Sequence, residues 1–171
     1  MDMLFKTVER RPFHLMLVLH TARDPSASEW SEYERELRRL QQLHPHDMEQ
    51  RVLTLIVSDG GSPNTEQRSR FQNDLFGGRP AKVALLTNSL GNPVKRGIVR
   101  ALTWMNTGFR ALEPTDLEGA LAYLGQPDLL EDVWSELCAL QTRLPPVQTL
   151  LGIAELSGRQ TPSSSRLAVS G

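Results

Sequence analysis

The sequence predicts an α/β domain in which crossover helices join a mainly parallel sheet of four to five strands, with one or more extra helices at the C-terminal end. Short apolar runs of strand length alternate with amphipathic segments of helical periodicity, and connections of that length join parallel strands. The size agrees, because 171 residues of which 39% are hydrophobic can bury one full core.

The first strand and the first helix are predicted within residues 13–43. Phe13 to Leu19 is a compact apolar run, which is typical of a strand buried on both faces. Asp24-Pro25 and the pair Ser26 and Glu29 offer two overlapping helix starts, the second being a capping box. The helix is expected over residues 28–43, because apolar residues recur there every three or four positions: Trp30, Tyr33, Leu37, Leu40 and Leu43.

Two further strand and helix pairs follow. A β-rich segment, Arg51 to Val57, predicts the second strand, and the polar stretch from Asn64 to Phe76 predicts a shorter, partly exposed helix. Lys82 to Leu86 predicts the third strand, after which Asn92-Pro93 opens a helix. The apolar face of that helix comprises Val94, Ile98, Ala101, Leu102 and Met105.

The last third of the domain is predicted to be mostly helical. A short edge strand is expected around Phe109 to Ala111, and Thr115 with Glu118 forms a capping box for the next helix. Pro127-Asp128 begins another helix with a broad apolar face. The expected organisation is a polar leader over residues 1–10, one domain over 11–142, and a largely flexible tail over 143–171 in which Val147 to Leu156 can form one short helix.

Composition narrows the classes of partner. A formal net charge of -1 argues against nucleic acid or an anionic membrane as the main partner. No apolar run approaches the roughly 18 residues of a membrane span, so membrane insertion is not expected. The single cysteine, Cys138, excludes an internal disulfide and fits a cytoplasmic location. No metal or other cofactor is expected. His44 and His46 lie close together with Asp47, but they fall in a turn, and the sequence offers no third strong ligand beside the two histidines.

The turn after the second strand is the most distinctive candidate site. It reads Ser58, Asp59, Gly60, Gly61 and Ser62. The two glycines permit close backbone approach, and Ser62 can cap a helix whose N–H groups favour an anion or a phosphorylated side chain. The alternative is an ordinary tight turn. Further polar candidates at the same sheet edge are His20, Thr87 and Asn88.

A second candidate surface is the basic helix after the third strand. Six basic residues lie between Leu75 and Leu112 without an acidic one, whereas Glu113 to Glu136 holds only acidic charges. The two patterns indicate either solvated helix faces or a bipolar docking surface for a protein. The candidate contact residues are Lys95, Arg96, Arg100 and Trp104, the last of which is either core or an exposed anchor.

Three segments carry a family resemblance: Asp24-Pro25-Ser26 leading to Trp30 and Tyr33, Ser58 to Asn64 with Gln67-Arg68, and Val94 to Asn106. Over roughly residues 10 to 125, the chain resembles the STAS superfamily (sulphate transporter and anti-sigma-factor antagonist), especially its divergent stand-alone bacterial branch. The resemblance implies a regulatory module that binds a kinase or anti-sigma partner. It also implies a phosphorylated switch, which by position is Ser58 or Ser62.

The leading functional hypothesis is therefore a non-enzymatic cytoplasmic signalling or scaffold module that binds a protein partner. The motifs of nucleophilic catalysis are not found, because no Ser occupies a Gly-x-Ser-x-Gly elbow. The alternative is a small-molecule or anion-binding domain, or an enzyme, that uses the strand-end residues His20, Asp59, Ser62, Thr87 and Asn88. A third hypothesis is a homodimer, because the apolar face with Trp134, Leu137 and Leu140 either covers the sheet or forms a dimer seam.

Overall fold

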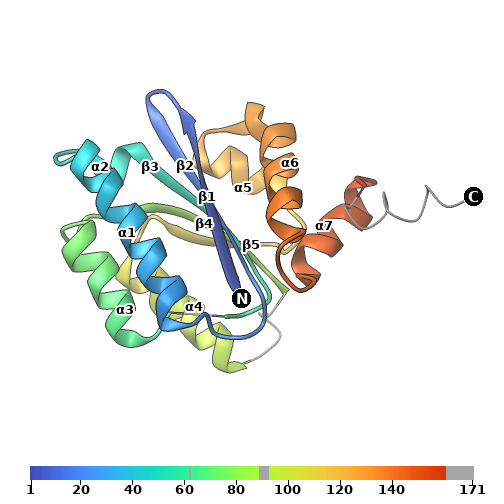
Figure 1. The fold of residues 1–171 in the computed structure, drawn as a ribbon, viewed down its shortest axis with the longest axis horizontal. Coiled ribbons are helices and arrows are strands. Elements are labelled where there is room, and N and C mark those ends of the chain that lie inside the picture. The colour runs from blue at the N-terminus through green and yellow to red at the C-terminus, as the bar shows by residue number, and fades with distance from the viewer. Residues whose placement is uncertain (62, 89–92, 161–171) are drawn as a thin grey trace, which may run out of the picture.

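The structure, a computed structural model, describes residues 1–61, 63–88 and 93–160 (Figure 1). A five-stranded sheet has the strand order β1-β2-β3-β4-β5, in which β1 runs antiparallel to β2 and the other neighbours are parallel. The predicted α/β class with a mainly parallel sheet is confirmed. The strands are β1 (Met3–Arg10), β2 (Phe13–His20), β3 (Val52–Ser58), β4 (Lys82–Thr87) and β5 (Phe109–Leu112).

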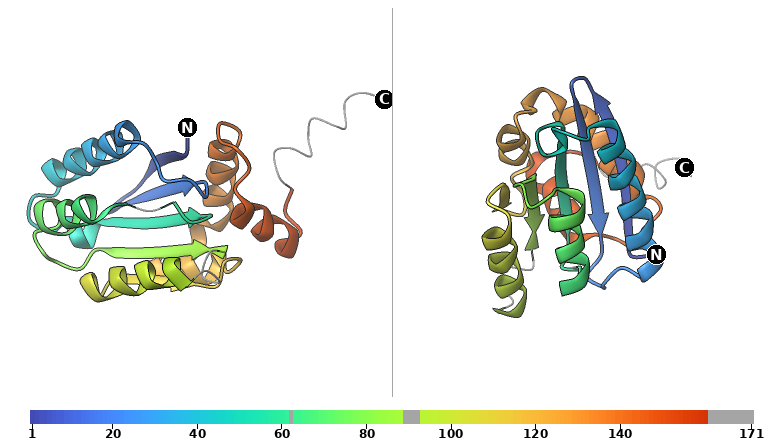
Figure 2. Two further views of the ribbon diagram at one scale, coloured as in Figure 1. Left: turned by 90° about the horizontal axis from the view of Figure 1, so that it is seen from below. Right: turned by 90° about the vertical axis from the view of Figure 1, so that its left-hand side faces the viewer.

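The helices lie between and after these strands, on both faces of the sheet (Figure 2). The first group comprises α1 (Ala27–Leu43), α2 (Met48–Arg51), α3 (Thr65–Ser69), its π-helical continuation η1 (Arg70–Leu75) and α4 (Pro93–Met105). The second group comprises α5 (Leu117–Leu124), the 3₁₀ turn η3 (Pro127–Leu129), α6 (Leu130–Gln141) and α7 (Gln148–Ser157). No helix of the described ranges combines the length and apolar character needed to cross a membrane.

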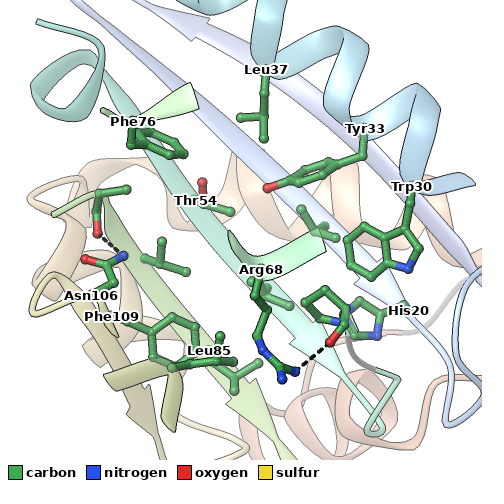
Figure 3. A pocket seen from close by; sticks show the side chains of 16 residues that line it. His20, Trp30, Tyr33, Leu37, Thr54, Arg68, Phe76, Leu85, Asn106 and Phe109 are labelled. Carbon is green, nitrogen blue, oxygen red and sulfur yellow. Dashed lines mark hydrogen bonds between the residues drawn. The ribbon is translucent and has the colours of Figure 1, made fainter. Parts of the chain in front are cut away.

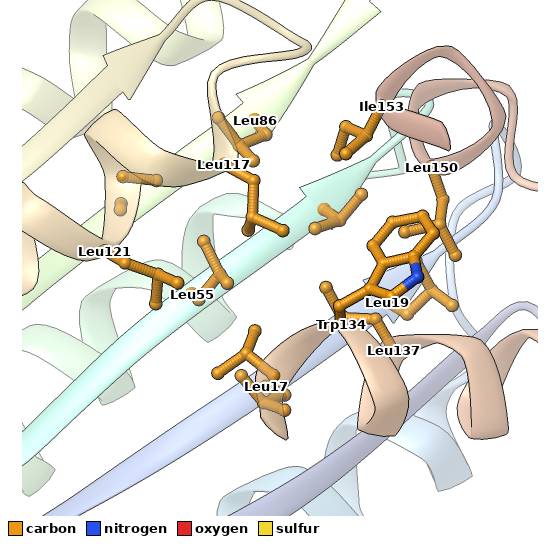
Figure 4. Close-up of a cluster of buried hydrophobic side chains, with 14 of the residues drawn as sticks. Leu17, Leu19, Leu55, Leu86, Leu117, Leu121, Trp134, Leu137, Leu150 and Ile153 are labelled. Atoms are coloured by element: carbon orange, nitrogen blue, oxygen red, sulfur yellow. The ribbon is translucent and has the colours of Figure 1, made fainter. Parts of the chain in front are cut away.

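The alternation of side chains along the strands creates two cores. In β2, Leu15, Leu17 and Leu19 point to one face and Met16 and Val18 to the other. The leucine face packs against α5, α6 and α7 (Figure 4), whereas the opposite face packs against α1. Both faces of β2 are therefore covered, which is why its sequence is apolar at nearly every position.

The leader predicted over residues 1–10 is instead the edge strand β1. It pairs with β2 in antiparallel register from Met3 opposite His20 to Arg10 opposite Phe13. Its apolar side chains serve both cores, since Met3 belongs to the α1 side and Leu4 packs on the α6 side. The segment is partly polar in sequence because Lys6 and Arg10 are exposed. An edge strand pairs with a neighbour on one side only and leaves its other side to solvent.

The short helix predicted over Val147 to Leu156 is confirmed as α7, which spans Gln148–Ser157. The prediction that this part of the chain is flexible tail is wrong, because Val147, Leu150 and Ile153 are at most 2% exposed and share one core with α6. Residues 161–171 lie outside the described part of the chain.

One helix start also differs from its predicted cap. The N-cap of α5 is Asp116, whose carboxylate accepts a hydrogen bond from the Gly119 N–H at 2.8 Å, in place of Thr115. A carboxylate is as good a helix cap as a hydroxyl.

Glu29 joins the start of β1 to the start of α1. Its carboxylate accepts hydrogen bonds from the backbone N–H groups of Asp2 and Met3 at 2.6 and 2.8 Å, and from the N–H and hydroxyl of Ser26 at 2.8 and 2.7 Å. Partial burial by itself would raise the pKa of Glu29, but the bonds from Ser26, Met3 and Asp2 outweigh burial and lower the pKa to about 2.

Glu29→Gln is expected to lower the free energy of unfolding at pH 7 by about 1–3 kcal/mol. The carboxylate stabilises the fold above the unfolded-state pKa of 4.5, and this contribution is lost as the pH falls toward the folded-state pKa of about 2. Urea unfolding at pH 7, 5 and 3 should show the difference from the parent chain shrinking with pH. The exposed neighbour variant Glu32→Gln should change little. An equal loss at pH 7 and pH 3 would show that the charge of Glu29 is not responsible.

Candidate functional site

A cavity of about 150 Å³ lies between the sheet and the helices α1, α3 and α4 (Figure 3). Its floor consists of side chains that share one face of β2, β3 and β4, among them Val18, Ile56 and Leu85. Its walls include Trp30 and Tyr33 of α1, with Leu102 of α4. The lining is mostly apolar, so the cavity is suited to an apolar group.

The helices on this side leave the centre of the sheet incompletely covered. Ile56 in β3 and Val83 in β4 remain partly exposed, whereas Leu55 and Ala84, their neighbours on the opposite face, are fully buried. The chain that crosses this part of the sheet is short, because α3 has five residues and η1 has six. The cavity is thus a consequence of how this crossover is built.

His20 lines the cavity at the carboxyl end of β2 and is held in place by Ser58. The Nδ1 atom of His20 lies 3.0 Å from the Ser58 hydroxyl oxygen, which also accepts a hydrogen bond from the Gly60 N–H at 2.9 Å. The hydroxyl proton can then be donated to Nδ1, an arrangement that favours a proton on Nε2 of neutral His20. Ser58 is only 2% exposed and does not line the cavity, so its role is to orient His20.

Arg68 of α3 lies at the same end of the cavity (Figure 3). Its guanidinium donates to the Pro63 carbonyl at 2.7 Å and to the Thr65 hydroxyl at 3.0 Å. These bonds hold a partly buried cation beside the apolar lining. Arg68 is not among the site residues predicted from the sequence, because nothing in the helical pattern shows that it faces inward.

Three neutral polar side chains also line the cavity. Tyr33 is hydrogen bonded to Thr54 on the floor, and burial raises the pKa of Tyr33 to about 12 despite this bond. Its hydroxyl is therefore protonated at neutral pH. At the far end, the Asn106 side chain donates to the Ala81 carbonyl at 2.8 Å and accepts from the Gly108 N–H at 2.9 Å. Asn106 thereby closes the cavity near the start of β4.

The predicted turn holds the C-terminal helix in place. The carboxylate of Asp59 accepts hydrogen bonds from the N–H groups of Gln148 and Thr149 at 2.6 and 2.8 Å, and from the Thr149 hydroxyl at 2.9 Å. It therefore caps α7 from another part of the chain. Gly61 packs so closely that a Cβ there would lie 2.4 Å from the Arg23 carbonyl oxygen.

The remaining residues predicted at the turn and at the sheet edge have different surroundings. Gly60 has a φ of 124°, a conformation that favours glycine. Asn88 donates its N–H to the Thr149 hydroxyl at 3.2 Å, and Thr87 is buried. Of the edge residues predicted from the sequence, His20 lines the cavity, whereas Asp59 and Asn88 contact α7. Ser62 lies outside the described residues.

The basic helix predicted from the sequence is α4, and the predicted acidic segment extends into α6. Arg96 and Arg100 are exposed on α4, while the side chains of Lys95 and Trp104 lie outside the described part of the structure. Acidic residues of α6 pair within the chain: Glu136 with Lys6 at 2.6 Å, Glu131 with Arg159 at 2.7 Å, and Asp132 with Arg10 at 3.9 Å. A docking surface on α4 stays a prediction. The apolar face of α6 covers the sheet of its own chain through Trp134, Leu137 and Leu140. This is one of the two alternatives that the sequence predicted for that face.

His44, in the predicted turn, is partly buried beside His14. Its ring lies 4.9 Å from that of His14, centroid to centroid, and both side chains are partly buried. Burial, together with the charge of His44, lowers the pKa of His14. Within the described ranges, no three His, Cys, Asp or Glu side chains gather as a metal site would require.

The cavity is the feature that sequence reasoning missed. Trp30 and Tyr33 appear in the sequence as part of an apolar helix stripe, which predicts core packing equally well. Only the arrangement of α1, α3 and α4 over the sheet shows that these side chains border a space. Comparison of the chain with family models, with curated proteins and with solved structures finds no match.

Proposed function

We propose that this chain is a small-molecule-binding module whose ligand occupies the cavity between the sheet and the helices α1, α3 and α4. The observation that carries the proposal is an apolar cavity of about 150 Å³ above the partly exposed Ile56 and Val83. The polar residues His20 and Arg68 stand at one end of it. Apolar walls with a few placed polar groups are characteristic of ligand sites in proteins.

The energetics favour an occupant. The cavity is partly open, because Ile56 and Val83 on its floor remain partly exposed. An apolar group that covers them gains about 25 cal/mol for each Å² of apolar surface removed from water. An apolar core cavity of about 150 Å³ in another protein binds benzene, which sets the scale of the apolar group.

The position agrees with the topology. In parallel sheets, ligands bind outside the carboxyl ends of the strands. His20 ends β2, and the hydrogen bond from Ser58 holds its ring in one orientation. The site is therefore organised before any ligand arrives, which lowers the entropy cost of binding. Regulation of a protein partner, the leading hypothesis from the sequence, stays a prediction.

The test is a titration with benzene and toluene, followed by methyl and amide NMR and by the unfolding temperature. Binding should shift resonances of residues that line the cavity and should raise the unfolding temperature as the ligand concentration increases. Absence of any shift at aqueous saturation with both compounds would refute the proposal.

Val83→Phe is the matched variant, because its larger side chain grows into the cavity from the floor. It should abolish the NMR shifts and leave the protein folded, since the added ring has space to occupy. Val8→Phe, on the opposite face of the sheet, should leave binding unchanged. Retained binding in Val83→Phe would place the ligand elsewhere.

A further inference from the structure

The geometry points to a ligand that carries a single carboxylate, bound by Arg68, on an apolar body about the size of a benzene ring. This inference rests on the proposed function and names the class of ligand for the same cavity. It is carried by the surroundings of the Arg68 guanidinium.

Arg68 differs from the other arginines of comparable burial. In the described ranges, the partly buried arginines are Arg51, Arg68 and Arg159. Arg51 pairs with Asp47 and Arg159 pairs with Glu131. Among the described residues, Arg68 instead donates to two neutral oxygens, those of Pro63 and Thr65. A partly desolvated cation without an acidic partner is costly, and an anionic ligand removes that cost.

The guanidinium is also presented for bidentate binding. Arginine has five N–H donors, and Pro63 and Thr65 accept from the two terminal nitrogens, one bond each. The remaining donors can form the parallel pair of hydrogen bonds that a carboxylate accepts. The bond to the Pro63 carbonyl fixes the side chain, so the fork is oriented before the ligand binds.

Arg68 is the one arginine or lysine among the described lining residues, which favours a monoanion. The other polar lining groups are His20 at the same end and the neutral groups of Tyr33, Thr54 and Asn106, and the remaining walls are mostly apolar. One guanidinium compensates one negative charge, whereas a phosphate carries nearly two at neutral pH. A carboxylate at Arg68 leaves its apolar body over Leu85 and Ile56, within the cavity.

The experiment compares benzoate with benzamide, which has almost the same shape and no charge. Dissociation constants are measured by NMR titration at pH 7 with the full chain. Benzoate is expected to bind at least tenfold more tightly than benzamide. Arg68→Gln should weaken benzoate binding at least tenfold and leave benzamide within twofold. Arg68→Lys, which keeps the charge and loses the planar fork, should give an intermediate loss for benzoate.

The matched control is Arg70→Gln, because Arg70 is exposed and already pairs with Glu66 at 2.8 Å. It should leave both dissociation constants unchanged. Equal affinity for benzoate and benzamide, with both shifting cavity resonances, would overturn the carboxylate assignment and leave the proposed function standing. Loss of benzoate binding in Arg70→Gln as large as in Arg68→Gln would also overturn it. Failure of benzene, toluene, benzoate and benzamide alike would refute the proposed function itself.

Discussion

A chain that ends at Arg143 is expected to lose its cooperative fold. The truncation removes Val147, Leu150 and Ile153, each at most 2% exposed. These residues share one core with α6, and Figure 4 shows Leu150 and Ile153 in that core with Trp134 and Leu137. Burial of one such side chain contributes about 1.5–3 kcal/mol. The combined loss of roughly 5–9 kcal/mol is comparable to the total stability of a typical domain, about 5–15 kcal/mol. Circular dichroism and urea unfolding of the two chains measure the effect. A truncated chain that unfolds at the same urea concentration would contradict it.

A point variant tests the same contact in the full chain. Leu150→Ala is expected to lower the free energy of unfolding by about 2–4 kcal/mol, because Leu150 is 1% exposed and the surrounding core cannot fully collapse. Leu156, on the same helix, is 77% exposed. Leu156→Ala should therefore change stability by less than about 0.5 kcal/mol. Similar losses in the two variants would mean that α7 does not pack as described.

Asp59→Ala is expected to release the N-terminus of α7 and to cost about 2–3 kcal/mol. The carboxylate accepts three hydrogen bonds from Gln148 and Thr149, and without it the first N–H groups of the helix have no acceptor in this position. Hydrogen exchange of the α7 amides should accelerate more than that of β3, because the lost bonds belong to the helix. Stability is measured by urea unfolding on the same samples.

Asp116→Ala provides the comparison for Asp59→Ala. Asp116 caps α5 through one hydrogen bond to Gly119 within its own helix, and its removal should cost about 1 kcal/mol. It should not accelerate exchange in α7. Unchanged stability and exchange in Asp59→Ala would show that the turn has no structural role and would favour the anion site predicted from the sequence.

The contacts of the turn also bear on whether a kinase can reach Ser58. Ser58 is 2% exposed, with its hydroxyl engaged by His20 and Gly60. A kinase could therefore reach it only if the turn opened locally. Because Asp59 and Ser58 connect α7 and His20 to the same strand end, opening the turn would disturb the helix and the cavity together.

The sequence by itself determined the layered α/β fold and most of its elements. In α1, the repeat of Trp30, Tyr33 and Leu37 predicts a helix because its spacing matches 3.6 residues per turn, and the capping box of Ser26 and Glu29 marks its start. The apolar run of β2 predicts a strand covered on both faces. These features are local, so neighbouring residues suffice to define them.

The tertiary structure decided where those elements leave space and which polar groups meet. β1 is recognisable only through its pairing with β2, and only the structure shows that the short helix predicted at α7 is buried in the core. Asp59 and Thr149 are 90 residues apart in the chain, yet they form one cap. The cavity likewise exists because α1, α3 and α4 meet over the sheet without filling it, and Arg68 borders it because α3 is packed there. Local periodicity determines an element and its apolar side, whereas distances between elements depend on packing among all of them.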